Sequence, residues 1–467
     1  MIYYILPRKV RWVWLLVTSY YFYMGWNAKY ALLLLTSTAI TYVSGLLLGR
    51  SRSKWVVGLS FVSNLGILFF FKYYDFTANT LVQILGHWGI TMAPPKLDLL
   101  LPVGISFYIF QALGYTMDVY RGEIAPERNF FKYALFVSFF PQLVAGPIER
   151  SKNLLEQIRK LHRFQYDQMV EGVLLMIWGY FLKLVIADRI AIFVDHAYST
   201  EVLYDGKYMF LASVLFAVQI YCDFAGYTTI AMGAAKVLGF TLMDNFNCPY
   251  MAVSVGEFWR RWHISLSSWF RDYLYIPLGG NRKGVRRKYL NLMIVFLTSG
   301  LWHGANWTYV IWGGLNGMFQ VIGEVLMPVR PLARLKGKSV RVLRVFRMAG
   351  TFLLIDFTWI FFRASDVNYA ISVVKRILHW GDEALLANGM LWDLGLNRQN
   401  FVVLVVALLI LLISDLFKYR GIVVRQKLVE GPYVLRLLTM VVSVCSILLW
   451  GIWGSGYDAT SFIYFQF

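Results

Sequence analysis

The 467-residue sequence has few cysteines and few charged residues. Its three cysteines, Cys222, Cys248 and Cys445, lie far apart in or near apolar segments. They form no CxxC pair and no zinc-ligand spacing, so we predict small buried side chains rather than a disulfide or metal framework. The N-terminus lacks the order of a signal peptide, because its apolar part precedes the basic residues.

Apolar residues are more frequent than in soluble proteins. They make up 58% of the chain, against about 45–50% in soluble domains. A spanning helix needs about 20 mostly apolar residues. The pattern predicts an all-α polytopic membrane protein with about eleven transmembrane helices in a single membrane domain, 1–467. Candidate spans are roughly 12–26, 31–49, 55–74, 99–120, 133–148, 168–194, 208–238, 289–301, 304–327, 348–363, 400–417 and 433–453.

The net charge of +19 is concentrated in short Lys and Arg clusters between these runs. Such clusters are typical of cytoplasmic loops under the positive-inside rule, and they argue against nucleic-acid binding. With the basic loop 282–288 in the cytoplasm, span parity places the tail 454–467 on the extracytoplasmic side. Parity fails across 99–149, where either one segment is re-entrant or the division into spans is wrong, and the topology of 1–30 and of 99–149 stays open.

Two polar segments interrupt the apolar pattern, and each contains a histidine. Seven residues of the segment 256–273 would share one face of a helix by their spacing: Trp259, Trp262, His263, Leu266, Trp269, Phe270 and Tyr273. In the segment 298–308, His303 lies between two apolar half-segments. Polar backbone at membrane depth must be buried in protein or line a wet cavity. An ionisable residue there is a functional hypothesis by default, with a structural polar contact as the alternative.

Histidines at membrane depth can serve three kinds of chemistry. A metal site requires three or four ligands close together. The sequence contains no HExxH motif and no Cys/His cluster, so we predict no metal site. A proton relay wants a chain of membrane carboxylates, and only Asp223 and Asp356 qualify. General-base catalysis needs one neutral imidazole near a hydroxyl or thioester, which favours a transferase or hydrolase.

Two blocks carry a resemblance to a known family. Residues 260–282 read RRWHISLSSWFRDYLYIPLGGNR, and residues 299–317 read SGLWHGANWTYVIWGGLNG. Both resemble the signature blocks of the membrane-bound O-acyltransferase (MBOAT) superfamily, and most closely its bacterial alginate O-acetylation branch. Supporting blocks lie at 101–123, 139–150 and 219–233. The resemblance implies a ring of helices and re-entrant segments around a central tunnel, in the bacterial inner membrane.

The resemblance also implies a reaction and its partners. Cytosolic acetyl-CoA would donate an acetyl group for O-acetylation of an extracytoplasmic polysaccharide. An extracytoplasmic SGNH-hydrolase-like acetyltransferase would complete the transfer to the polymer. His303 would be the catalytic histidine and His263 the second one. Tyr464 in the tail would be an acyl relay, with an interfacial aromatic anchor as the alternative. Further tunnel or substrate residues would be Trp302, Asn306, Trp262, Asp223 and the bracing pair Arg271 and Asp272.

The acceptor polymer stays open at this point. An alginate-like or other exopolysaccharide is the leading hypothesis, with peptidoglycan O-acetylation or D-alanyl transfer to teichoic acid as alternatives. Two non-enzymatic hypotheses are a scaffold in an envelope polysaccharide complex and a transporter of a lipid-linked sugar. Such transporters tend to have broken helices in two repeated halves, and we find no such repeat.

Overall fold

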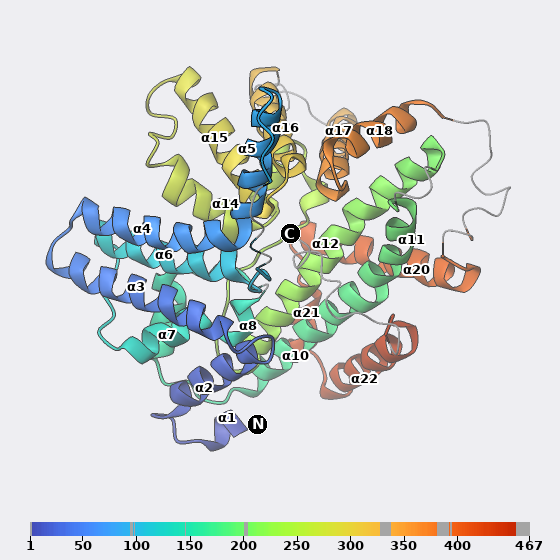
Figure 1. The fold of residues 1–467 in the computed structure, drawn as a ribbon. Coiled ribbons are helices and arrows are strands. Elements are labelled where there is room, and N and C mark those ends of the chain that lie inside the picture. Colours follow the sequence, from blue (N-terminus) through green and yellow to red (C-terminus); the bar gives the residue numbers. More distant parts are fainter. Residues whose placement is uncertain are drawn as a thin grey trace. The chain divides into compact units, whose positions relative to one another are not determined.

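The computed structural model describes residues 2–93, 97, 99–144, 146–199, 204–326, 338–380, 392 and 395–453. Every regular element in these ranges is a helix (Figure 1). The chain forms two compact units. The first contains Met1–Gly172 and Ala231–Met243, and the second contains Val173–Ile230 and Asp244–Phe467.

Most helices lie wholly within one or the other of the two units. The first unit contains α1 (Ile2–Ile5), α2 (Arg11–Met24), α3 (Tyr30–Arg50), α4 (Lys54–Leu68), η1 (Phe69–Tyr73), α5 (Tyr74–Gly86), α6 (Ile105–Arg121), α7 (Phe130–Ser138), α8 (Phe140–Leu143) and α9 (Ser151–Arg159). The second contains η2 (Phe181–Ala187), α11 (Asp188–Ala197), η3 (Pro249–Met251), α13 (Val255–Arg261), α14 (Ile264–Phe270), η4 (Arg271–Tyr275), α15 (Val285–His303), α16 (Trp307–Leu326), α17 (Lys338–Arg363), α18 (Val367–Leu378), α20 (Arg398–Tyr419), α21 (Val424–Glu430) and α22 (Tyr433–Trp450). Both units share α10 (Tyr166–Tyr180) and α12 (Gly206–Val237).

Seven helical stretches in the described chain are long and apolar enough to cross a membrane. They are Tyr30–Arg50, Lys54–Gly86, Tyr166–Ala197, Gly206–Val237, Arg341–Arg363, Arg398–Tyr419 and Tyr433–Trp450. Each covers most or all of a span expected from hydropathy. The polytopic helical architecture is therefore confirmed, while the count of about eleven spans and the tunnel stay predictions.

The stretch 99–149, where span parity failed, contains short helices. The helical backbone is interrupted at Phe139, whose ψ is 107°. This residue separates α7, of 9 residues, from α8, of 4 residues. A 9-residue helix is about 14 Å long, less than half of a hydrocarbon core of about 30 Å. The single span expected over 133–148 is therefore wrong, because the apolar composition there does not correspond to one continuous helix.

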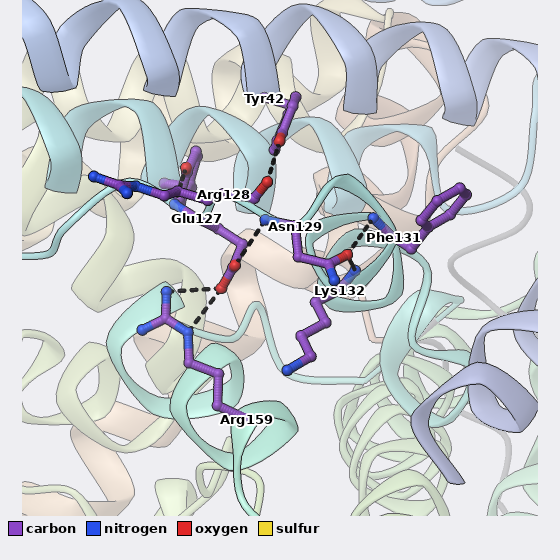
Figure 2. Close-up of polar contacts among 8 residues, drawn as sticks. Tyr42, Glu127, Arg128, Asn129, Phe131, Lys132 and Arg159 are labelled. Carbon is purple, nitrogen blue, oxygen red and sulfur yellow. Dashed lines mark hydrogen bonds and ion pairs between the residues drawn. The ribbon is translucent and has the colours of Figure 1, made fainter. Parts of the chain in front are cut away.

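A polar network in the first unit holds the start of α7 (Figure 2). One carboxylate oxygen of Glu127 accepts from the backbone N–H of Asn129 at 2.9 Å, and the other pairs with Arg159 of α9 at 2.7 Å. Tyr42 of α3 donates to the carbonyl oxygen of Arg128 at 2.6 Å. The Asn129 side chain caps α7 by accepting two backbone N–H groups. The entry into this short helix is thus fixed by its neighbours α3 and α9.

In the second unit, α15 and α16 lie side by side as a helical hairpin (Figure 1). Glycines allow the backbones of α15 and α16 to approach closely. A Cβ built at Gly300 of α15 would meet the carbonyl oxygen of Tyr309, and one at Gly313 of α16 would meet that of Phe296. Small residues at such an interface let two helix backbones approach closely. The hairpin fixes the end of α15, where His303 lies.

We expect Gly313→Ala to lower the thermal unfolding midpoint of the detergent-solubilised protein by several degrees. The added methyl group has no room, and overpacking costs about 1–3 kcal/mol. Gly323→Ala is the matched control in the same helix, because nothing lies within 4 Å of a Cβ built there. Its midpoint should stay level or rise, since Ala is the better helix former. Equal midpoints for the two variants, measured by circular dichroism, would contradict the close contact.

Candidate active site

His303 is the last residue of α15 and is buried in an aromatic cluster. Its ring centroid lies 4.9 Å from that of Trp302, 5.0 Å from that of Trp312 and 5.5 Å from that of Phe362. The rings meet edge to face, a favourable geometry for aromatic pairs. The C-terminal end of a helix favours a positive charge through the helix dipole. This position therefore combines a water-poor surrounding with a feature that stabilises an imidazolium.

His263 lies at a corner between α13 and α14. The expectation of one helix through 256–273 is wrong, because α13 ends at Arg261 and α14 begins at Ile264. The backbone of His263 has φ 44° and ψ 54°, in the left-handed region. Residues with a Cβ rarely adopt this conformation, which costs about 1–3 kcal/mol and is found preferentially at functional sites. The corner replaces the expected continuous aromatic face with two short helices.

The second unit brings both histidines together. The ring centroids of His263 and His303 lie 6.3 Å apart, and the ring of Trp302 lies 6.0 Å from His263. Phe224 of α12 meets the His263 ring edge to face at 4.7 Å. The two histidines come from separate polar segments of the sequence, and their approach creates a candidate site for acid–base chemistry.

Asn245 contacts His263 directly, and the sequence pattern had not pointed to it. Nδ1 of His263 lies 3.2 Å from Oδ1 of Asn245, and both side chains are buried. Burial lowers the pKa of His263, which lies outside the seven candidate spans, to about 3. The ring is therefore neutral at physiological pH. Asn245 precedes His263 by 18 residues in an irregular loop, so no periodic signal pointed to it.

Trp262 belongs to an aromatic layer that continues to His303. Its ring stacks on Phe258 at 5.4 Å and lies 5.2 Å from Trp359 of α17. Trp359 in turn stacks on Trp312 at 5.7 Å, next to His303. Trp312 and Trp359 were not singled out from the sequence, because an aromatic residue in an apolar span gives no sign of whether it faces lipid or protein.

Asn306 holds the turn between α15 and α16. Its Oδ1 accepts from the backbone N–H of Thr308 at 3.1 Å, and its Nδ2 donates to the carbonyl oxygen of Ser365 at 2.9 Å. These bonds fasten the turn that follows His303 to the loop before α18. Asn306 thus supports the site through the backbone.

Arg271 and Asp272 form an ion pair in η4, with Arg271 Nε 2.7 Å from Asp272 Oδ1. The two side chains are 63% and 29% exposed, whereas both histidines are buried. An exposed pair of this kind contributes little to stability. The pair is therefore not a member of the buried cluster, and its role toward the tunnel or substrate stays a prediction.

Asp223 of α12 lies in a buried ionic triad. Lys183 Nζ, in the π-helical turn η2, is 2.7 Å from Asp188 Oδ1 and 2.7 Å from Asp223 Oδ1. All three side chains are at most 8% exposed. Buried charges are tolerated when they are paired, so the triad ties η2 to α12. Asp223 immediately precedes Phe224, whose ring contacts His263. Lys183 was not anticipated, because it is a single charge within an apolar run.

Tyr464 and the tail 454–467 lie outside the described residues. The chain just before the tail is fastened in the second unit. Arg189 donates to the carbonyl oxygen of Trp450 at 2.6 Å. The backbone N–H of Ile452 donates to the carbonyl oxygen of Leu184 at 2.9 Å. No cluster of three His, Cys, Asp or Glu side chains suited to hold a metal occurs among the described residues.

Fold and site together define a multi-pass helical membrane protein with a buried pair of histidines. The model of the MBOAT, membrane-bound O-acyltransferase, family matches residues 125–362. The probable alginate O-acetylase AlgI of Pseudomonas aeruginosa is 38% identical over 419 residues, covering 88% of this chain and 76% of the relative. The same-named protein of Pseudomonas putida is also 38% identical, over 88% of this chain and 82% of its own length. The peptidoglycan O-acetyltransferase of Helicobacter pylori is 34% identical over 78% of this chain and 73% of its own length.

The chain belongs to the membrane-bound O-acyltransferase family, and it is an acyltransferase. The resemblance inferred from the two signature blocks is therefore confirmed. Both blocks lie entirely inside the matched range, and so do both histidines.

We expect Lys183→Met to destabilise the protein by about 3–5 kcal/mol, because it leaves two buried carboxyl groups without this cation. The measurement is the thermal unfolding midpoint in detergent. Adding Asp188→Asn and Asp223→Asn should restore much of the loss, since neutral groups often replace a buried ionic triad without penalty. Lys288→Met is the control: its ion pair with Glu324 is about one-third exposed, and such pairs contribute about 0–1 kcal/mol. Equal losses at Lys183 and Lys288 would contradict the stabilising role of the triad.

Proposed function

We propose that this acyltransferase takes an acetyl group from cytosolic acetyl-CoA and passes it through a membrane tunnel for O-acetylation of an extracytoplasmic polysaccharide. An alginate-like or other exopolysaccharide is the proposed acceptor, because the relatives at 38% identity are named probable alginate O-acetylases. The observation that carries the chemistry is the buried pair of histidines, with ring centroids 6.3 Å apart.

His303 is the proposed general base. A thioester is already activated, so transfer needs a base and a water-poor site rather than a metal. The oxygen of the acceptor hydroxyl attacks the acetyl carbonyl carbon, and its proton passes to His303. The carbon–sulfur bond then breaks, and His303 returns the proton to the sulfur of CoA. The products are an O-acetyl ester and CoA thiol, and the histidine ends neutral. The rings of Trp302 and Trp312 next to His303 support this assignment, because they keep water away.

The proposed donor path follows α15. Arg286 and Arg287 are exposed in its first turn, and a basic end of this kind attracts the phosphates of CoA. The helix has 19 residues, so it is about 28 Å long, close to the hydrocarbon thickness of about 30 Å. Its basic first turn and His303 thus lie at opposite ends of the helix. A basic entrance in the cytosol agrees with the positive-inside rule.

Tyr464 is proposed to carry the acyl group onward from the outer mouth, as a phenyl ester. In this scheme the C-terminus is extracytoplasmic, and an SGNH-hydrolase-like partner moves the group to the polymer. The contacts of Trp450 and Ile452 support the scheme, because they fix where the tail begins. An interfacial anchor remains the competing role for Tyr464.

Peptidoglycan is the second candidate acceptor. The relative named peptidoglycan O-acetyltransferase is 34% identical over 78% of this chain, so the shared machinery serves more than one polymer in the family. D-alanyl transfer to teichoic acid is a more distant alternative. Ester-linked acetate, released by mild alkali from purified exopolysaccharide and from purified peptidoglycan of the same cells, distinguishes the acceptors.

We expect His303→Ala to lower polymer-bound acetate in a gene-deletion strain by about 10²–10⁴-fold, the usual contribution of a general base. The same variant in proteoliposomes should release CoA thiol from acetyl-CoA correspondingly slowly. His379→Ala is the matched control, because His379 is exposed and bonds only locally, to the carbonyl oxygen of Lys375, in its described contacts. Acetylation at the wild-type level with His303→Ala, at equal protein abundance, would sink the assignment.

We expect Tyr464→Phe to abolish polymer acetylation at normal protein abundance, because the change removes the hydroxyl oxygen that would bear the acyl group. With carbonyl-labelled acetyl-CoA, the wild-type protein should carry label on a C-terminal peptide and the variant should not. Tyr457→Phe makes the same chemical change in the same tail and serves as control. Normal acetylation with Tyr464→Phe would leave only the anchoring role.

A further inference from the structure

We propose that Asn245 is a positioning residue that fixes the tautomer of His263, with the proton on Nδ1 and the lone pair on Nε2. This inference rests on the proposed function, in which His263 is the second histidine of the site. It assigns a role to a residue outside both signature blocks.

Asn245 is tied to the corner that carries His263. Its backbone carbonyl oxygen accepts from the N–H of Ile264 at 3.0 Å. Its side-chain Oδ1 accepts from the N–H of Ser265 at 3.0 Å and from the Ser265 hydroxyl at 2.9 Å. The first N–H groups of a helix need partners from outside the helix, and His263 as N-cap residue supplies no side-chain cap. Asn245 therefore caps α14 from a distant part of the chain.

This capping bond determines which way the Asn245 amide faces. The oxygen and nitrogen of an amide group are alike in shape, so their assignment rests on the hydrogen-bond network. The backbone N–H of Ser265 can only donate, so the atom that faces it must be the amide oxygen. The Ser265 hydroxyl can satisfy either arrangement, whereas the backbone group cannot.

The orientation of the amide then fixes the imidazole. Nδ1 of His263 lies 3.2 Å from the same oxygen, which is only an acceptor, so Nδ1 carries the hydrogen. In a neutral ring with one proton, Nε2 then has the lone pair. Phe224, edge to face at 4.7 Å, and the left-handed backbone restrict the ring further.

The tautomer makes the two histidines chemically different. In this tautomer Nε2 of His263 can accept a hydrogen bond and has no proton to donate, so any substrate group that bonds to it must carry a hydrogen. Stabilisation of an oxyanion must then come from another donor. His303, at the C-terminal end of α15, is in the better position to become an imidazolium.

The test uses the full-length protein in liposomes, with ¹⁵N-labelled histidine and the His263 signal assigned by its loss in His263→Gln. The wild-type ¹⁵N shifts should report a proton on Nδ1. Asn245→Ala should give a mixture of tautomers. With the SGNH-hydrolase-like partner and the polysaccharide present to accept the acetyl group, it should also reduce kcat for CoA release from acetyl-CoA by about 10–100-fold, the loss typical when the hydrogen-bond partner of a metal-ligating histidine is removed. KM for acetyl-CoA should stay within about twofold, because uniform substrate binding is untouched. Asn245→Asp keeps the acceptor oxygen and should keep the Nδ1 proton.

A purely structural cap would give a different result. Asn291→Ala is the control, because Asn291 is another fully buried asparagine of the second unit, and it bonds the carbonyl oxygen of Gly280 at 2.9 Å. A lower unfolding midpoint for Asn245→Ala than for Asn291→Ala, with the tautomer unchanged, would overturn the proposal. A proton on Nε2 in the wild type would also overturn it. Failure of the proposed function is separate: the wild type would then release no CoA, whereas the ¹⁵N signals would still report the tautomer.

Discussion

Polar groups in apolar surroundings need partners from within the protein, and this constraint organises the second unit. The helix α12 provides two of these partners. Its Asp223 pairs with Lys183 of η2, and its Ser213 donates to Asp356 of α17 at 2.9 Å. Apolar contacts between helices have little directional preference, whereas each polar pair is satisfied in one register only. The polar pairs therefore determine how η2, α12 and α17 are aligned, and Phe224 on α12 reaches His263 as a result.

The same constraint shapes the site itself, which in the proposed function must be polar enough for proton transfer and dry enough to protect a thioester. Tryptophan suits this combination, because a large apolar ring carries a single N–H group. Each histidine lies at a break in a helix: His303 ends α15, and His263 turns the chain before α14. At such breaks the side chain can face the interior without a whole polar helix face beside it. The strained backbone of His263 is stabilised by Asn245, whose two oxygens bind the following turn.

Sequence reasoning reached the features that depend on local pattern. Long spans such as 208–238 follow from hydropathy alone, and both histidines were singled out by their polar segments. The corner at His263 was missed because the aromatic 3–4 spacing continues across it, while a positive φ at a residue other than glycine leaves no trace in spacing. Asn245 was missed for another reason. Its partner lies 18 residues further along the chain, and only tertiary structure brings the two together. The break at Phe139 shows the same limit, since composition records apolarity and not continuity.

The family resemblance makes His303 the catalytic histidine and His263 the second one, and the surroundings of the two rings differ as well. One lies at the negative end of a helix dipole, and the other has its Nδ1 proton committed to an amide oxygen. When two titratable groups share a site, environments that favour different protonation states indicate different roles. A protein with a symmetric pair would have to exchange protons between the two rings, whose centroids lie 6.3 Å apart. An asymmetric pair needs no such exchange, because in the proposed reaction one ring moves the proton while the other holds its partner in place.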